Sequence, residues 1–339
     1  MRERVGVARL FLLTAVMSTP DIPLLDIAAW RDGGESQRAR LAARMDQALR
    51  QSGFLLIENH GVPAGLRDRL RAEASRFFAL PAGQKEPYAT PLAGRGWLPP
   101  GGEANAFYGE VADPGRADLK ESLTNGRGNG FLTGDPEIDA AWFAPNVWPA
   151  ETPDLSALAD EFTSQARELY YDLLRMGALA LGLDRDFFVA RVRSGTETFN
   201  INRYPPLSET GPAKQGQYRV APHTDWGMLT ILDRQPGYGG LQVQAMDGSW
   251  ADAPYVPDAF TINVADLLSR WTGELWRSTR HRVLPPPEQA PEEELISLIV
   301  FFDADVDAVV EPVIGNRELA PVVAGEWLSA RAASAAVPR

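Results

Sequence analysis

The chain contains no cysteine, and only three of its 339 residues are histidine. The absence of cysteine rules out disulfide bonds and metal sites built on thiolates, and it removes the disulfide evidence that would point to secretion. Basic residues are also scarce: 33 lysines and arginines stand against 45 aspartates and glutamates, which gives a formal net charge of −12. This excess of negative charge argues against nucleic acid or an anionic membrane as a partner.

The beginning of the chain lacks an apolar run long enough to cross a bilayer. The most apolar stretch there, residues 10–16, is too short. Arg2 and Arg4 precede it, so the segment superficially resembles a short signal peptide. Met17 offers a second start, and we expect residues 1–19 to be a disordered or wrongly assigned leader, with a functional export signal as the alternative. The rest of the chain is expected in the cytoplasm.

The first part of the chain is predicted to be helical, with one irregular segment. Apolar residues recur at helical spacing in 35–51, 63–79 and 155–183, and the apolar run 54–57 follows the first helix as a strand. Residues 91–150 are rich in glycine, proline and asparagine and show little periodicity. An irregular stretch of this length in a compact domain is typical of a cover over a functional site.

After Gly195 the pattern changes to short β-rich segments separated by glycine and proline turns. The predicted strands are 198–204, 229–232, 241–244, 260–264, 281–284 and 295–302, and residues 322–337 form a closing helix. Strands at this spacing suggest a barrel or a jelly roll. We therefore predict an α+β chain in which a helical and irregular region, 20–195, packs on a double-stranded β-helix core with a C-terminal helix, 196–339.

Two of the three histidines can meet around one aspartate. His223 and Asp225 form a His-x-Asp pair, and because strand side chains alternate, both would lie on one face of a strand. His281 would arrive from a distant strand and complete a set of two imidazoles and one carboxylate. This facial arrangement leaves coordination positions open and is typical of non-haem Fe(II) sites that also bind O2 and an organic co-substrate. A structural metal, or histidines that are simply buried and hydrogen-bonded, are the alternatives.

Further short motifs accompany this set in a fixed order. They include Ile-Pro-Leu-Leu-Asp at 22–26, Asn-His-Gly-Val at 59–62, Arg-Gly-Trp at 95–97, Asp-Leu-Lys-Glu at 118–121, Asn-Arg-Tyr-Pro-Pro at 202–206 and Gly-Gly-Leu-Gln-Val at 239–243. With these motifs the chain resembles the isopenicillin N synthase-like branch of the Fe(II)/2-oxoglutarate-dependent oxygenases. The resemblance extends over residues 20–335.

The resemblance implies an enzyme whose Fe(II) is held by His223, Asp225 and His281. O2 and 2-oxoglutarate would be consumed, 2-oxoglutarate would leave as succinate, and a C–H bond of a small organic metabolite would be hydroxylated, desaturated or used in a cyclisation. No obligate protein partner is evident. His60, in a turn that recurs across the family, is expected to be structural rather than a ligand.

The resemblance also implies residues that hold the co-substrate. Asn202 and Tyr204 are two apart on one predicted strand and share a face. In the family such a pair reaches the co-substrate; ordinary strand polarity is the alternative. Ser297 keeps the place of the serine in the family's Arg-x-Ser motif, but Leu295 stands where the arginine would be. An arginine gives a carboxylate two charge-assisted hydrogen bonds, and a leucine gives none.

Another arginine is therefore needed if 2-oxoglutarate binds in the usual pose. Arg219 has the same strand parity as His223 and is our candidate, whereas Arg203 and Arg282 would face away from the site. A changed pose of 2-oxoglutarate, a different co-substrate or none at all are the alternatives.

Substrate contacts are predicted at three aromatic residues. Trp226 lies beside the metal set, with a purely structural tryptophan as the alternative, and Phe107 and Tyr108 fall in the irregular segment that would cover the pocket. Lys120 and Glu121 are expected to form a structural ion pair with each other, with an acid/base pair as the alternative.

Two other functions remain compatible with the sequence. One is an Fe(II) oxidase of the isopenicillin N synthase or aminocyclopropane carboxylate oxidase kind, which needs no 2-oxoglutarate; Leu295 raises this possibility. The other is a non-catalytic binding protein with the same fold. The sequence carries no nucleotide-binding fingerprint in a strand-helix context and no Ser-His-Asp set.

Overall fold

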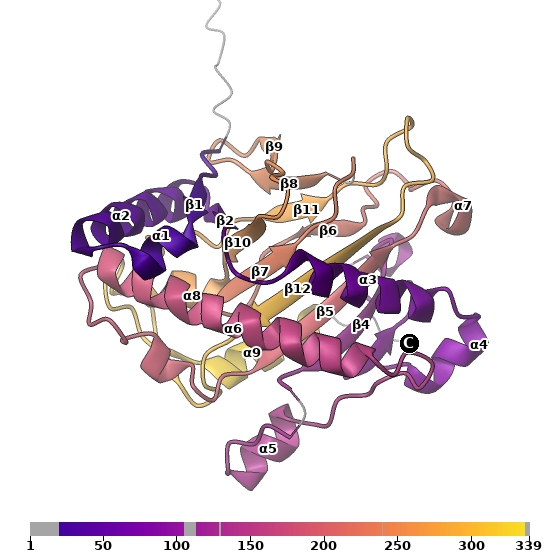
Figure 1. The fold of residues 1–339 in the computed structure, drawn as a ribbon, viewed down its shortest axis with the longest axis horizontal. Coiled ribbons are helices and arrows are strands. Elements are labelled where there is room, and N and C mark those ends of the chain that lie inside the picture. The colour runs from indigo at the N-terminus through magenta and orange to yellow at the C-terminus, as the bar shows by residue number, and fades with distance from the viewer. Residues whose placement is uncertain (1–19, 105–112, 129, 239, 336–339) are drawn as a thin grey trace, which may run out of the picture.

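The computed structural model describes residues 20–104, 113–128, 130–238 and 240–335. Its centre is a pair of sheets (Figure 1). The larger sheet has eight strands in the order β1-β2-β10-β7-β12-β5-β4-β3, and the smaller has four in the order β6-β11-β8-β9. Two such sheets built from crossing, mostly antiparallel connections form a jelly roll, and the predicted α+β fold with a double-stranded β-helix core is confirmed.

The strands of the large sheet are β1 (Leu24–Asp26), β2 (Phe54–Glu58), β3 (Gly96–Leu98), β4 (Glu121–Gly126), β5 (Glu197–Tyr204), β7 (Leu229–Asp233), β10 (Phe260–Val264) and β12 (Leu295–Phe302). The strands of the small sheet are β6 (Val220–His223), β8 (Leu241–Gln244), β9 (Trp250–Asp252) and β11 (His281–Val283). A separate pair joins β13 (Val309–Val310) to β14 (Val322–Val323). The helices are α1 (Ile27–Asp32), α2 (Glu35–Gln51), α3 (Ala64–Phe78), α4 (Ala82–Lys85), α5 (Pro136–Trp142), α6 (Leu155–Ala180), α7 (Leu207–Thr210), α8 (Asp266–Trp271) and α9 (Ala324–Ala335).

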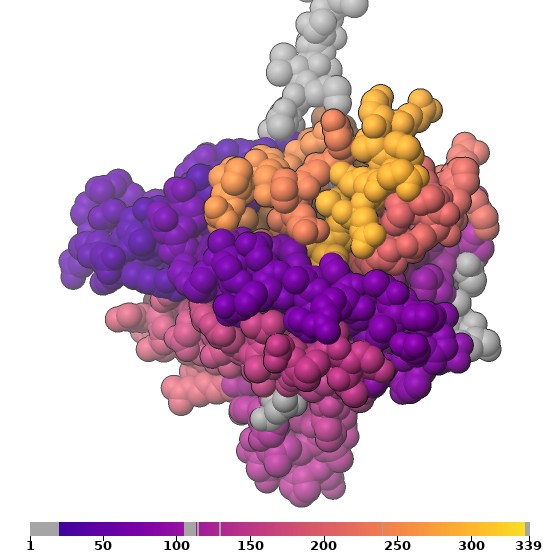
Figure 2. Space-filling model, turned by 45° about the vertical axis from the view of Figure 1, so that its right-hand side comes forward, coloured from indigo at the N-terminus to yellow at the C-terminus, as the bar shows by residue number. Residues whose placement is uncertain are grey.

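Helices cover the outer face of the large sheet. Figure 1 shows α3 and α6 side by side across that face, and in the space-filling view the violet band that includes α3 lies between the magenta α6 and the orange-to-yellow later part of the chain (Figure 2). The face of α6 that points to the sheet is apolar: Phe162 packs against Phe199 and Phe260, and Tyr170 stacks on Phe302 at 4.4 Å between ring centroids. Burying each such side chain stabilises the fold by about 1.5–3 kcal/mol, so this layer holds the sheet in place behind the site.

The segment predicted to be irregular is partly a strand. Within 91–150 the chain adds β3 and β4 to the edge of the large sheet, next to β5. Alternation of apolar and polar residues was absent because β4 carries polar groups on both faces, as Glu121, Ser122 and Thr124 illustrate. The closing helix, predicted from residue 322, begins at Ala324, after β14. The predicted leader, 1–19, lies outside the described residues.

Candidate active site

A cavity of about 400 Å³ lies between the two sheets. The side chains of β4, β5, β7 and β12 that point away from the helices form one wall, and residues of β6, β8 and β11 form the other. Helix α9 contributes Leu328 to the lining. It is anchored by Arg331, which donates to the hydroxyl of Thr224 at 3.1 Å and is ion-paired with Asp266. The last helix is therefore bonded to the loop between His223 and Asp225.

His223, Asp225 and His281 meet at one end of this cavity. Their potential ligand atoms all lie within 4.8 Å of one another. His223 and His281 are direct partners across β6 and β11, and the Nε2 atoms of the two rings lie 3.5 and 3.6 Å from Asp225 Oδ1. Asp225, however, is not on a strand: β6 ends at His223, and the expectation that one strand carries both side chains is wrong. The loop after β6 turns the carboxylate back toward the rings.

The backbone fixes the orientation of both imidazoles. His223 Nδ1 lies 2.8 Å from the carbonyl oxygen of Ala221, and His281 Nδ1 lies 3.0 Å from that of Thr279. A carbonyl can only accept, so each Nδ1 carries a proton, and in the neutral form of each ring Nε2 keeps its lone pair. Hydrogen bonds of this kind to the second ring nitrogen are typical of metal-binding histidines.

The carboxylate of Asp225 is held in the same selective way. Its Oδ2 accepts hydrogen bonds from the Thr230 hydroxyl and, at 2.6 Å, from Asn263 Nδ2, whereas Oδ1 faces the two rings. Thr230 is on β7 and Asn263 on β10, directly opposite each other in the large sheet. One oxygen is thus satisfied by the protein and the other is left for a cation.

Burial and mutual charge set the protonation states of the three groups. Burial together with the charge of His223 lowers the pKa of His281 to about 4. Burial alone would raise the pKa of Asp225, but the neighbouring His281 and hydrogen bonds from His223 and Asn263 lower it well below its usual range. Burial alone would lower the pKa of His223, but the hydrogen bond and charge of the Asp225 carboxylate raise it. An ionised carboxylate and lone-pair-bearing imidazoles are the forms that bind a metal, and two nitrogens plus one carboxylate oxygen fit Fe(II) with positions left open.

The third histidine lies elsewhere. His60 stacks on Phe260 with 3.7 Å between ring centroids, its Nε2 is 2.8 Å from the carbonyl oxygen of Asp258, and its Nδ1 accepts from the Val62 amide. Both ring nitrogens therefore have partners within the protein, which agrees with the structural role expected for His60.

The residues predicted to hold the co-substrate gather at the other end of the cavity. Asn202 on β5 pairs with Ser297 on β12, and Tyr204 pairs with Leu295. The hydroxyl of Tyr204 hydrogen-bonds with the side chains of Asn202 and Ser297, and burial raises its pKa. Asn202 Oδ1 also accepts from the Ser122 hydroxyl at 2.8 Å. The structure brings these three predicted residues together, with the apolar Leu295 among them.

Arg219 lies near this end but its charge is already paired. The guanidinium carbon is 5.7 Å from the centroid of the Tyr204 ring, and the side chain is fully buried. It donates to the Glu293 carboxylate at 2.8 Å and to the Glu293 carbonyl at 2.7 Å. Arg219 does not line the cavity.

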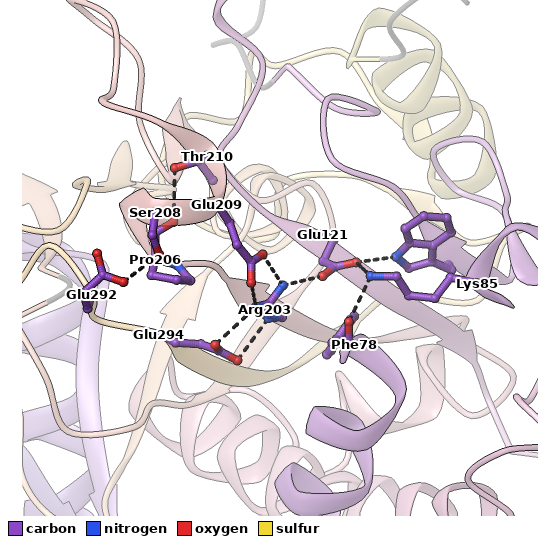
Figure 3. Close-up of polar contacts among 11 residues, drawn as sticks. Phe78, Lys85, Glu121, Arg203, Pro206, Ser208, Glu209, Thr210, Glu292 and Glu294 are labelled. Atoms are coloured by element: carbon purple, nitrogen blue, oxygen red, sulfur yellow. Dashed lines mark hydrogen bonds and ion pairs between the residues drawn. The ribbon is translucent and has the colours of Figure 1, made fainter. Parts of the chain in front are cut away.

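Lys120 and Glu121 do not form the expected ion pair with each other, because neighbouring residues of a strand point to opposite faces. Lys120 lines the cavity and is paired with Glu103. Glu121 lies on the outer face, where it accepts from Lys85 at 2.8 Å and from Arg203 at 2.9 Å (Figure 3). The expectation that Arg203 faces away from the site is confirmed.

Arg234 and Asp303 are charged residues of the cavity wall that were not predicted from the sequence. Arg234 follows β7 with the parity of Thr230, and Asp303 follows β12. Both stand directly after apolar strands, where the change from apolar to charged residues was a usable signal. Of the predicted aromatic contacts, Trp226 lines the cavity and is half-buried. Phe107 and Tyr108 lie outside the described residues.

Comparisons with known proteins agree with this architecture. Residues 196–304 match the 2OG-Fe(II) oxygenase superfamily, and residues 22–151 match a family described as the N-terminal region of a non-haem dioxygenase in morphine synthesis. Validamycin A dioxygenase of Streptomyces hygroscopicus subsp. limoneus is 40% identical over 316 residues, which are 91% of this chain and 85% of that protein. A homoarginine-6-hydroxylase of Glycine max is 28% identical over 333 residues, 91% of this chain and 96% of the relative.

Solved structures give the same result. A full-length protein of Neurospora crassa, crystallised in complex with alpha-KG, superposes with a TM-score of 0.78 at 28% identity, covering 92% of this chain and 96% of that one. A putative 2OG-Fe(II) oxygenase from Caulobacter crescentus superposes with a TM-score of 0.77 at 26% identity, covering 92% and 98%. Within the described part of the chain, no helix is both long enough and apolar enough to span a membrane.

Proposed function

This chain belongs to the Fe(II)/2-oxoglutarate-dependent oxygenases, and we propose that His223, Asp225 and His281 are the ligands of its iron. It is an enzyme that uses Fe(II), 2-oxoglutarate and O2 to oxidise a small organic molecule. The convergence of the three side chains within 4.8 Å, with one carboxylate oxygen and two Nε2 atoms left available, is the observation that supports the assignment.

The iron, when bound, supplies the redox chemistry that activates O2, and the protein supplies position. The carbonyls of Ala221 and Thr279 keep both imidazoles turned toward the metal position, and Thr230 and Asn263 hold the carboxylate. Ala221, Thr230 and Asn263 lie on strands β6, β7 and β10, so the backbone of the two sheets fixes the position of most of these partners. Such pre-organisation lowers the cost of binding.

The polar end of the cavity would orient the oxo acid. We assign Asn202, Tyr204 and Ser297 to its far carboxylate, since their side chains form one hydrogen-bonded group on adjacent strands. The Tyr204 hydroxyl, whose pKa burial raises, stays protonated and can donate to an anion. Trp226, beside the metal position, would contact the substrate and exclude water. Phe107 and Tyr108 remain proposed contacts from a segment outside the described residues.

The binding partners and the cellular location of the enzyme are also proposals. The net charge of −12 supports a small-molecule substrate and gives no support to nucleic acid or a membrane surface as partner. With no cysteine to favour an oxidising compartment, we propose that the enzyme works in the cytoplasm. The irregular segments around the cavity would decide which small molecule is bound.

The test uses the purified protein under anaerobic conditions. Fe(II) and 2-oxoglutarate together should produce the visible metal-to-oxo-acid charge-transfer band, and admission of O2 should release succinate. Asp225→Ala should show neither. A wild-type protein that binds Fe(II) yet shows no band at saturating 2-oxoglutarate, and oxidises substrate without forming succinate, would instead be an oxidase that needs no 2-oxoglutarate.

A further inference from the structure

One cation on the cavity wall has no acidic partner among the described residues. Arg234 is half-buried and lines the cavity. Its contacts are a hydrogen bond to the carbonyl oxygen of Pro254 and a position 5.6 Å from the centroid of the Tyr255 ring. Burial lowers the pKa of Arg234 to about 10, which still leaves it protonated at neutral pH. A protonated guanidinium that is partly desolvated and unpaired is costly unless an anion joins it.

Two other basic residues near this cavity are already neutralised. Lys120 is paired with Glu103, and Arg219 with Glu293. On the outer face of the same strands, Arg203 is surrounded by carboxylates (Figure 3). Arg234 is therefore the described cavity residue whose positive charge is available to a ligand.

The sheet register locates Arg234 beside the polar end. Leu298 pairs with Asp233, so the next position along brings Arg234 opposite Ser297. The backbone segments of β7 and β12 remain adjacent beyond their last paired residues, because the amide of Ile296 donates to the Gln235 side chain at 2.6 Å. Asp233 points outward to Arg67 and Arg71, so by strand alternation its neighbour points into the cavity.

Arg234 lies well away from the metal position along β7. Arg234 lies four residues beyond Thr230, the residue that bonds Asp225, which corresponds to about 13 Å at roughly 3.3 Å per residue. Leu295 is its diagonal neighbour across β7 and β12, and such neighbours lie within reach of long side chains. The guanidinium can thus extend to the space in front of Leu295 and Ser297.

We infer that Arg234 on β7 supplies the cation for the far carboxylate of the oxo acid, in place of the arginine that Leu295 on β12 has replaced. The inference rests on the proposed function. It also balances charge: Fe(II) and Asp225 together carry one positive charge, Arg234 adds a second, and 2-oxoglutarate carries two negative ones. Without Arg234 the closed site would hold one uncompensated negative charge.

The experiment compares two oxo acids that differ in the far carboxylate alone. The anaerobic Fe(II) protein is titrated with 2-oxoglutarate and with 2-oxopentanoate, which ends in a methyl group, and the charge-transfer band is followed. Arg234→Gln should weaken 2-oxoglutarate binding about 10- to 150-fold, the loss expected for one charge-assisted hydrogen bond. Binding of 2-oxopentanoate should not change, and it shows that iron and pocket are intact.

Matched variants assign the effect to position as well as to charge. Arg191→Gln, the same change at an exposed arginine over Phe187, should behave as wild type. The double variant Arg234→Leu with Leu295→Arg moves the cation from one strand to the other and should restore most of the preference for 2-oxoglutarate. Arg234→Met, apolar and nearly as long, repeats the test if the glutamine variant folds poorly.

The outcomes distinguish failure of this inference from failure of the proposed function. If the wild-type protein gives no band with either oxo acid, the proposed function fails. If the wild-type band forms and Arg234→Gln binds 2-oxoglutarate as tightly as wild type, the role of Arg234 is refuted and the proposed function stands. Equal weakening for both oxo acids, or a selective loss in Lys120→Met with none in Arg234→Gln, also refutes it. Loss of substrate binding alone would assign Arg234 to a substrate anion instead.

Discussion

The two faces of β4, β5 and β12 carry charge in opposite ways. On the outer face Glu121, Arg203 and Lys85 neutralise one another, with Glu209 and Glu294 completing the network (Figure 3). On the inner face, polar groups are held in position but left with free bonding capacity toward the cavity. The same backbone therefore supports a closed network on one side and an open one on the other, and the open one is where ligands are expected.

Removing a metal ligand from the inner face should have the largest effect. Asp225→Ala and His223→Ala should abolish iron binding and turnover, because each removes one of three protein ligands. His60→Ala, which changes the histidine stacked on Phe260, should leave the iron content nearly unchanged. Iron titration of the three variants is the measurement. Full iron occupancy in the Asp225 variant would refute the ligand assignment.

Breaking the charge network on the outer face should have the second-largest effect. Glu121→Gln leaves Lys85 and Arg203 buried with one charge fewer between them, and breaking a buried pair in this way costs about 3–5 kcal/mol of unfolding free energy. Glu209→Gln is the control: this carboxylate is half exposed, and its loss should cost about 1 kcal/mol or less. Urea unfolding compares the two variants, and equal losses would show that the network is not a closed unit.

The pH dependence of the unfolding free energy tests whether Asp303, which lines the cavity, is protonated. Burial raises the pKa of this carboxyl, which accepts from the Thr196 hydroxyl at 2.7 Å, to about 7. The unfolded chain releases this proton near pH 4, so the wild-type protein loses stability as pH rises from about 4 to about 7, by at most about 1.4 kcal/mol per pH unit.

Asp303→Asn should remove that loss. Relative to wild type, the variant should gain about 2–4 kcal/mol of unfolding free energy between pH 4 and pH 8. Asp247→Asn, at an exposed turn, should leave the pH dependence in this range unchanged. Urea unfolding at several pH values makes the comparison, and parallel curves for wild type and Asp303→Asn would contradict the protonated state.

The smallest effect is expected at a residue that hydrogen-bonds a proposed metal ligand. Asn263→Ala removes the amide that holds Asp225 Oδ2, and loss of such a partner costs about 10- to 100-fold in metal affinity. Asn125→Ala removes a buried amide of β4 whose side chain has no hydrogen-bond partner among the described residues, so it should leave the affinity unaltered. Competition against a chelator measures both. Indistinguishable affinities would mean that Asn263 does not position the carboxylate.

The sequence was sufficient where one chemical requirement determines the residue. Strands of the core show apolar periodicity, and a His-x-Asp pair with a distant histidine is characteristic of a facial metal site, so both the jelly roll and the convergence of the three side chains were predictable. The contacts of Lys120 and Glu121 were not predictable, because β4, which begins at Glu121, is polar on both faces, and their partners, Glu103 and Arg203, are brought to them only by tertiary contacts. Arg234 was missed for a related reason: its relation to Leu295 depends on register across two strands.

The bond from Arg331 to Thr224 has a consequence for the order in which this enzyme is made. Thr224 separates two of the proposed ligands, and its partner lies more than a hundred residues later in the chain. While a ribosome is still synthesising the protein, the loop with His223 and Asp225 has emerged but the helix that secures it has not. Only after residue 331 has left the ribosome can this loop acquire that hydrogen bond, so the loop is secured more than a hundred residues after its own synthesis.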